Sequence, residues 1–334
     1  MSTMDFQQVF FKYIKEQLED NLSLVHEVSE ILSISADSAY RRLRGETELT
    51  FNEIHLISKH FNISVDSIMN NETNTVIFHY QEMDEENFSF VHYLKKILSN
   101  IQKIEKQDNK EIIFIANNIP FFHTFQIPEI SAFKSFVWQK TVLNNENMQQ
   151  KKFVFEKPDE QLKNVSKELR DIYTRIPSIE IFHPGTIDVT LNQIEYYSVA
   201  GLFENWKDAI VLCDKMTELV NHMENQAINA CKFHPKQKLP EITSPNYTLY
   251  FNDVLYIDDA ILVKSGNSKS VYLINMTLNS LVTNSTKFFD GFEKSVKNLM
   301  SKSTLISGTS EKERSRVFMN YRKKIDRLKE KLQF

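Results

Sequence analysis

Glycine and cysteine are scarce in this 334-residue chain, which holds six glycines and two cysteines. The glycines stand singly, so they provide neither a G-x-G-x-x-G nor a G-x-x-x-x-G-K phosphate-binding loop. Cys213 and Cys231 lie eighteen positions apart without a CxxC pair, and we expect buried free thiols. The motifs HExxH and G-x-S-x-G and a calcium loop are absent as well. The sequence therefore predicts no enzyme, no metal site and no cofactor.

Long apolar runs are also missing, and none approaches the ~20 residues that a membrane-spanning helix needs. The start, MSTMDFQQVFFKYIKEQ, has no basic region followed by an apolar stretch and a small-residue cleavage site. We therefore expect a cytoplasmic protein without membrane contact. The composition, 41% hydrophobic and 25% charged, is typical of a globular protein, and the length allows two domains.

Positive charge is unevenly distributed along a chain whose formal net charge is −4. Residues 1–70 hold six Lys/Arg and eleven Asp/Glu, yet Arg41, Arg42 and Arg44 fall within four positions. Residues 311–331, by contrast, hold nine Lys/Arg and four Asp/Glu. The acidic surroundings make the arginine cluster a candidate functional site.

Five short helices are predicted within an all-α domain of residues 1–72, which ends in the polar segment 70–75. Ser or Thr precedes four of these helices as an N-cap. The predicted caps are Ser23, Ser35, Thr50 and Ser64, with Glu53 completing a capping box at Thr50. From the helical periodicity, Gln7 falls on the polar face of the first helix and Phe51 on the inward face of the fourth.

The third predicted helix, residues 35–44, carries the arginine cluster. Its apolar side consists of Ala36, Ala39 and Leu43, and we expect this side to pack on the second helix. The side chains that point away or lie on the flanks are the candidate DNA contacts, namely Asp37, Ser38, Tyr40, Arg41, Arg42 and Arg44. A short helix after a tight turn fits the major groove, where Arg pairs with guanine and Ser or Asp reads base edges.

The segment SLVHEVSEILSISADSAYRRLRGETELTFNEIHLISKHFNISVDSIM, residues 23–69, resembles the five-helix helix-turn-helix domain of the Cro and phage-repressor (XRE) type. The resemblance implies a transcription regulator that binds double-stranded DNA. It implies that Ser29 is the small residue that lets the third helix approach, and that Gly45 ends the recognition helix. Two positions depart from the pattern, because Ser33 replaces a left-handed glycine in the turn and Arg42 occupies a slot that often holds a core residue.

Residues 76–334 are predicted to form a helix-rich α+β domain with a small antiparallel sheet. Segment 247–278 alternates around two turn signals, which is typical of a meander of three or four strands, and 110–116 is a further short strand. The Asn-, Lys- and Ile-rich composition suits an AT-rich bacterial genome, and the two-domain architecture resembles regulators of the Bacteroidota.

The last predicted helix, residues 310–332, leaves two alternatives open. Its apolar residues follow a 3-4-3-4 spacing, namely Phe318, Tyr321, Ile325, Leu328 and Leu332. This seam either pairs with a second copy or packs on its own domain. The basic face beside it either touches the DNA backbone or is only solvated. We expect a homodimer formed by some part of this domain, because specific regulators commonly bind two half-sites.

Histidines and aromatic residues of the second domain complete the set of candidates. His123, His183 and His234 have no partner at ligand spacing, so core or loop roles are expected rather than metal binding. The aromatic residues around 121–138 either line a small-molecule pocket or fill the core. Binding of a small-molecule or protein effector by this domain is therefore one of the alternatives.

The sequence therefore predicts a cytoplasmic, homodimeric, sequence-specific transcription regulator whose third helix enters the major groove. The alternative is a protein-interaction or adaptor protein whose helix-turn-helix no longer binds DNA. The acidic charge of residues 1–70 favours this alternative, because it opposes docking on phosphates.

Overall fold

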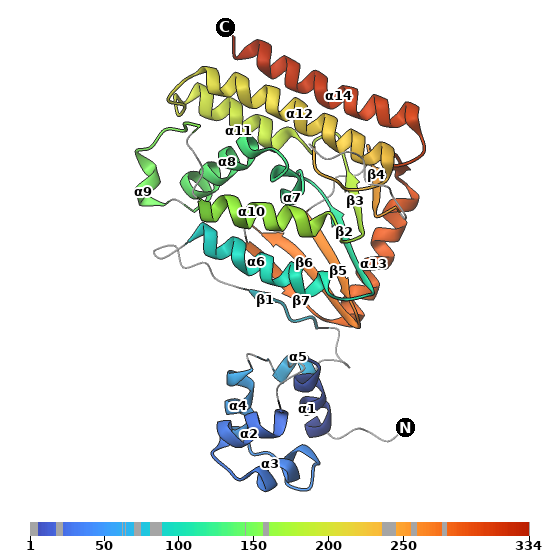
Figure 1. The fold of residues 1–334 in the computed structure, drawn as a ribbon. Helices are drawn as coiled ribbons and strands as arrows, with labels where there is room; N and C mark the ends of the chain where they lie inside the picture. Colours follow the sequence, from blue (N-terminus) through green and yellow to red (C-terminus); the bar gives the residue numbers. More distant parts are fainter. Residues whose placement is uncertain are drawn as a thin grey trace. The chain divides into compact units, whose positions relative to one another are not determined.

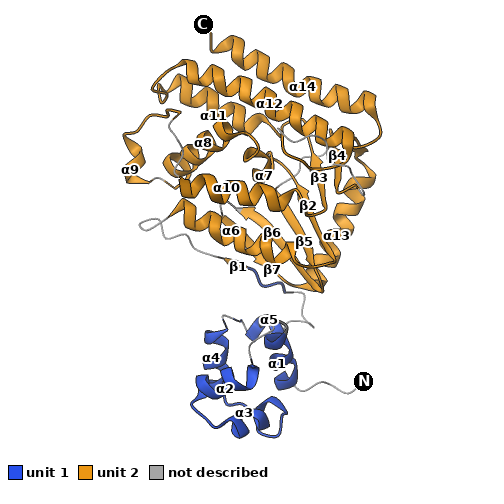
Figure 2. Ribbon diagram, in the orientation of Figure 1, with its two compact units in different colours: residues 1–78 blue, residues 79–334 orange. Residues whose placement is uncertain are grey.

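The chain divides into two compact units, Met1–Phe78 and His79–Phe334 (Figure 2). The computed structural model describes residues 6–17, 23–61, 63, 65–69, 75–80, 89–143, 145–155, 160–235, 245–254, 259–275 and 279–333. Within these residues, no helix combines the length and the apolar character needed to cross a membrane.

Unit 1 is built from short helices around a small apolar core (Figure 1). The helices are α1 (Phe6–Gln17), α2 (Leu24–Leu32), α3 (Ala36–Leu43), α4 (Phe51–His60) and α5 (Val65–Met69). Phe10, Ile14, Val28, Ala39 and Ile57 are fully buried between them. Each of these side chains lies on the apolar stripe of its helix, so the core follows from the helical periodicity of the sequence.

The ends of the helices in unit 1 agree only in part with the predicted caps. Ser35 caps α3 by accepting a hydrogen bond from the Ser38 amide at 3.2 Å, and Thr50 and Glu53 form the predicted capping box on α4. Ser23 occupies the N-cap position of α2 but accepts no capping hydrogen bond. The predicted cap Ser64 lies outside the described residues.

The predicted inward position of Phe51 is wrong. Its side chain is 91% exposed. Phe51 is the first residue of α4. Ile54 and Ile57, further along the same helix, pack against the core, whereas the first turn extends past it. The helical periodicity predicts which face of the helix Phe51 lies on. It does not show whether a neighbouring element covers that face at the end of the helix.

Unit 2 contains a mixed eight-stranded sheet with the order β1-β7-β6-β5-β2-β3-β4-β8. The strands are β1 (His79–Tyr80), β2 (Lys110–Ile115), β3 (Ser178–Phe182), β4 (Tyr247–Phe251), β5 (Ala260–Ser265), β6 (Ser268–Asn275), β7 (Asn279–Thr283) and β8 (Thr304–Leu305). The central strands β2, β3 and β4 run parallel, and the others join the sheet antiparallel.

The predicted small antiparallel sheet is therefore only one part of a larger mixed sheet. The turn at Gly266 joins β5 and β6 into a hairpin, as predicted, and Gly266 has a left-handed φ of 58°. Strand β4, the expected first strand of the meander, instead pairs parallel with β3 and antiparallel with β8. Alternation of apolar and polar residues indicates a strand but does not determine its neighbours.

Helices cover both faces of this sheet (Figure 1). They are α6 (Phe90–Glu105), α7 (Phe121–Thr124), α8 (Pro128–Val137) with a π-helical extension (Trp138–Val142), α9 (Glu146–Gln149), α10 (Glu160–Tyr173), α11 (Asp188–Val199), α12 (Lys207–Asn229), α13 (Thr286–Ser301) and α14 (Glu311–Lys331). On β2, Ile112 and Phe114 pack with α6 and α10, whereas Ile113 and Ile115 pack with α13. Successive residues of a strand thus serve opposite layers.

The apolar seam of α14 packs inside unit 2 rather than on a second copy. Phe318, Tyr321, Ile325 and Leu328 are buried in the same core cluster as the inward residues of α12. Of the two alternatives that the 3-4-3-4 spacing left open, packing on its own domain is confirmed. The aromatic segment 121–138 is likewise mostly core, since Phe122, Phe125, Phe133 and Trp138 are buried.

A buried carboxylate lies between the sheet and the helices that cover it. The Glu180 side chain on β3 is fully buried and accepts hydrogen bonds from Tyr173 at 2.5 Å and Tyr247 at 2.9 Å. The His123 Nε2 atom lies 2.9 Å from both carboxylate oxygens. Burial raises the pKa of Glu180, but His123, the Tyr173 hydroxyl and the charge of Lys232 together hold the pKa below its ordinary value. The four side chains come from α7, α10, β3 and β4, so the cluster ties these elements together.

Replacing Glu180 by Gln should destabilise unit 2 by about 3–5 kcal/mol, because it removes the charge that these three buried partners surround. Both tryptophans, Trp138 and Trp206, lie in unit 2, so denaturant unfolding followed by tryptophan fluorescence reports on this unit. Glu168→Gln on the exposed side of α10 is the matched control. Equal unfolding midpoints for the two variants would contradict the stabilising role of the cluster.

Candidate nucleic-acid interface

The connection between α2 and α3 is a tight turn. Ser33 has a left-handed backbone, with φ 54° and ψ 44°, as the resemblance implied. The amides of Ser33 and Ile34 donate to the carbonyls of Glu30 and Ser29 at 3.2 and 3.0 Å, which closes α2 in a Schellman arrangement. Ser35 then caps α3, so that two residues separate the last turn of α2 from the N-cap of α3.

The exposed side of α3 carries most of the candidate residues. Ala39 is fully buried and holds the helix against the core, while Asp37, Tyr40, Arg41 and Arg44 are exposed. Ser38 is half-buried, and its hydroxyl lies 2.9 Å from that of Ser35. The structure therefore brings four of the six predicted residues to one exposed surface.

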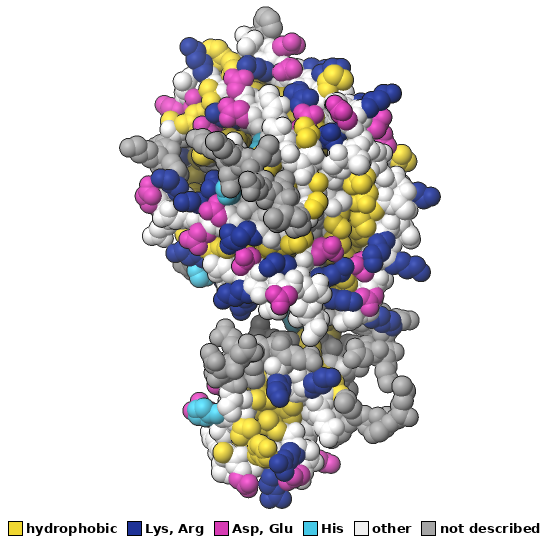
Figure 3. Space-filling view, turned by 45° about the vertical axis from the view of Figure 1, so that its right-hand side comes forward, with side chains coloured by type: hydrophobic (Ala, Val, Ile, Leu, Met, Phe, Trp, Pro, Cys, Tyr) yellow, Lys and Arg dark blue, Asp and Glu magenta, His cyan; other side chains and the backbone are white. Residues whose placement is uncertain are grey.

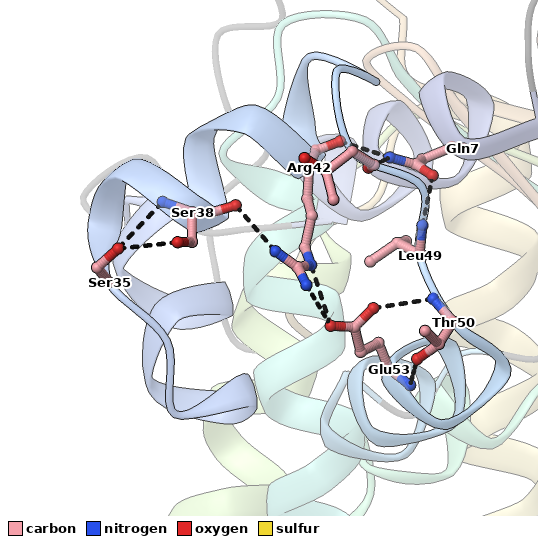
Figure 4. A network of polar contacts seen from close by, with 8 residues as sticks. Gln7, Ser35, Ser38, Arg42, Leu49, Thr50 and Glu53 are labelled. Atoms are coloured by element: carbon pink, nitrogen blue, oxygen red, sulfur yellow. Dashed lines mark hydrogen bonds and ion pairs between the residues drawn. The ribbon is translucent and has the colours of Figure 1, made fainter.

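Arg42 lies differently from the prediction, which put it on an exposed flank of α3. Its guanidinium donates two hydrogen bonds to Glu53 Oε1, at 2.7 and 3.0 Å, and one to the Ser38 carbonyl at 3.3 Å (Figure 4). The side chains of Arg42 and Glu53 are only 17% and 16% exposed. The prediction that Arg42 is exposed is thus wrong, because its guanidinium pairs with Glu53, the carboxylate of the α4 capping box. Arg42 holds α3 and α4 together.

Glu53 completes this link between the two helices. Its second oxygen accepts a hydrogen bond from the Thr50 amide at 2.8 Å. Burial raises the pKa of the Glu53 carboxyl, but the Thr50 amide and Arg42 outweigh burial and hold the pKa below its ordinary value. The carboxylate is therefore charged at neutral pH and serves as both a helix cap and an ion-pair partner.

Gln7 is a contact that the sequence reading missed. The helical periodicity predicts that Gln7 lies on the polar face of the first helix, but its side chain is only 7% exposed. Its amide nitrogen donates to the carbonyls of Arg42 and Thr47 at 2.7 and 2.8 Å, and its amide oxygen accepts from the Leu49 amide at 2.9 Å (Figure 4). The sequence gives little indication that Gln7 is buried, because a polar residue on the polar face of an amphipathic helix normally faces water. Gln7 anchors the loop that follows α3.

The exposed arginines interact with two neighbouring side chains. The Arg44 guanidinium lies 4.4 Å from the centre of the Tyr40 ring and donates to the Tyr40 hydroxyl at 3.3 Å. Glu46 lies 3.8 Å from Arg41 and 3.5 Å from Arg44. The surface thus combines two cations, an aromatic ring, a hydroxyl and two carboxylates, a set that can bind phosphates and the polar edges of bases.

The predicted basic face of α14 consists of Arg322, Lys323, Lys324, Arg327 and Lys331, and three of these residues form ion pairs within unit 2. Arg322 pairs with Glu224 at 2.6 Å and Lys324 with Asp188 at 2.7 Å, while Lys329 and Lys331 pair with Asp214 and Glu195. Figure 3 shows acidic and basic side chains mixed over the visible face of this unit. These pairs favour the reading that the basic face of α14 serves the fold rather than contact with DNA.

The three histidines considered above have structural partners. His123 pairs with Glu180, His183 Nε2 lies 3.1 Å from the Asn117 carbonyl, and His234 Nε2 lies 3.2 Å from Asp171. In the parts of the chain that the structure describes, no group of three His, Cys, Asp or Glu side chains is arranged to hold a metal ion.

Comparison of the chain with protein-family models, with curated proteins and with solved structures gives no match.

Replacing Gln7 by Ala should loosen the loop after α3 and lower its local stability by about 1–3 kcal/mol, because the Thr47 carbonyl and the Leu49 amide lose the partner that Gln7 provides, and the Arg42 carbonyl loses one of its two donors. Hydrogen exchange measured by mass spectrometry should show faster exchange for the peptide that contains Leu49. Gln8→Ala, at the exposed neighbouring position, is the control. Unchanged exchange in the loop of the Gln7 variant would show that the side chain does not anchor it.

Proposed function

We propose that this protein is a sequence-specific DNA-binding transcription regulator of the helix-turn-helix type, with α3 as the recognition helix. The observation that carries the proposal is the exposed surface formed by Tyr40, Arg41 and Arg44 on a helix that follows a tight left-handed turn. A helix of this kind can enter the major groove while the helix before it crosses the backbone. The resemblance of residues 23–69 to XRE-type domains supports the same reading.

The six candidate contacts divide into three groups in this proposal. Arg41 and Arg44 supply charge-assisted hydrogen bonds to guanine or phosphate. Asp37, Ser38 and Tyr40 contact base edges or sugar and phosphate oxygens. Arg42 acts indirectly, because its ion pair with Glu53 sets the angle at which α3 is presented.

A single copy of this domain is a weak DNA binder on electrostatic grounds. Residues 1–70 hold six Lys/Arg against eleven Asp/Glu, so their net negative charge opposes docking on phosphate. Two copies on a symmetric site would double the favourable contacts of α3. We assign dimerisation to unit 2. The same unit would bind a small-molecule or protein effector. The regulator would act in the cytoplasm.

The second candidate function is that of a protein-interaction or adaptor protein. The acidic charge of residues 1–70 and the pairing of both exposed arginines with Glu46 favour it. Selection of bound duplexes from a random-sequence pool separates the two functions, since an adaptor enriches no sequence.

Arg41→Ala should weaken binding to the selected site by about 1–3 kcal/mol if Arg41 reads a base, and Arg44→Ala should mainly reduce the salt dependence of binding. Fluorescence anisotropy titrations at several salt concentrations measure both effects. Lys12→Ala, on the exposed side of α1, is the control. A doubly substituted Arg41/Arg44 variant that keeps its circular dichroism spectrum and binds like the wild type would exclude α3 as the recognition helix.

The full-length protein should be a dimer at micromolar concentration, and a fragment of residues 1–75 should be a folded monomer with much weaker DNA binding. The reason is that unit 1 uses its buried apolar residues for its own core. Light scattering on both proteins measures their mass in solution. A monomeric full-length protein that still binds its site tightly would refute the dimer.

A further inference from the structure

Glu46 occupies a fixed position beside the exposed arginines. Gly45, with a left-handed φ of 77°, ends α3 and turns the chain back. The amides of Gly45 and Glu46 donate to the carbonyls of Arg42 and Arg41 at 3.0 and 2.9 Å, a Schellman arrangement. The chain beyond it is held by Gln7 at Thr47. The backbone of Glu46 is therefore tied to the same turn of α3 that carries Arg41.

The carboxylate of Glu46 is shared between two guanidinium groups. Its Oε2 atom lies 3.8 Å from Arg41 Nε, and its Oε1 atom lies 3.5 Å from Arg44 Nη1. The two arginine side chains are 58% and 59% exposed, and that of Glu46 is 49% exposed. Ion pairs between side chains so well solvated contribute little to stability, so Glu46 is not needed to hold the fold.

We propose that Glu46 limits the binding of DNA of arbitrary sequence by competing with phosphate for Arg41 and Arg44; this inference rests on the DNA-binding function proposed above. A duplex without the correct bases offers these arginines phosphates alone, and each phosphate must displace the carboxylate. The correct site adds hydrogen bonds to base edges, which compensate for the lost ion pairs. Glu46 is in this sense a positioning residue that increases discrimination between sites and lowers affinity for all of them.

The exposed charges around Glu46 provide a matched control. Glu48 lies two residues further along the same loop and is also exposed. Within the described residues it forms no ion pair with an arginine of α3, whereas Glu46 pairs with two of them. Glu48→Gln removes the same amount of charge from the same loop, so a comparison with Glu46→Gln isolates the effect of contact with the arginines.

The test measures binding of the full-length protein to a random-sequence duplex and to its selected site by fluorescence anisotropy. For Glu46→Gln we expect binding to the random duplex to tighten about fivefold at about 50 mM salt, and binding to the selected site to tighten less. Glu48→Gln should change neither affinity by more than about twofold. In the background Arg41→Ala/Arg44→Ala, the effect of Glu46→Gln should disappear, because no guanidinium remains for the carboxylate to hold.

Three results would overturn the proposal. If Glu46→Gln and Glu48→Gln behave alike, only the net charge of the loop matters. If Glu46→Gln tightens binding equally with and without the arginines, the carboxylate repels DNA directly. In both cases the proposed function stands as long as wild-type binding depends on Arg41 and Arg44. If neither the wild type nor Glu46→Gln binds any duplex, both this inference and the proposed function are wrong.

Discussion

The position of α3 depends on backbone groups at its C-terminal end that the helix cannot satisfy by itself. Gly45 and Glu46 satisfy the carbonyls of Arg42 and Arg41 through the Schellman hydrogen bonds, and Gln7 supplies a second donor to Arg42 and anchors the loop beyond it. Gly45 suits this position because a residue without a Cβ atom adopts the left-handed backbone conformation without steric strain. The arrangement of charges on the exposed side of α3 thus follows from neutral hydrogen bonds beneath it.

Three arginines of one helical turn have different roles because carboxylates lie at different depths around them. Glu53, fixed by its capping hydrogen bond, meets Arg42 where both side chains are mostly shielded from water, and the pair joins two helices. Glu46 meets Arg41 and Arg44 where water competes, and these pairs remain exchangeable. The same chemistry appears in unit 2, where the buried Glu180 joins α7, α10 and β4 to β3.

Local features of the sequence predicted much of unit 1 and less of unit 2. The cap at Ser35, the capping box at Thr50 and the left-handed Ser33 are confirmed, because each depends on residues within a few positions. Gln7 and Glu180 were missed, since their partners lie up to 42 and 67 residues away in the sequence. The helix-rich composition with a sheet is confirmed, but the mixed sheet was not predicted, because strand alternation does not specify partners.

Under the proposed function, selectivity for DNA depends on a small number of charges. Acidic residues outnumber basic ones in residues 1–70, and Arg322, Lys324, Lys329 and Lys331 of α14 are paired with carboxylates of unit 2. General electrostatic attraction to phosphate is therefore weak for this chain, and it weakens further while Glu46 engages both exposed arginines. A protein with so little non-specific attraction has to obtain its affinity from base contacts and from two copies on one site. The acidic character of unit 1, which at first favours an adaptor, is then equally compatible with a regulator that rejects most of the DNA it meets.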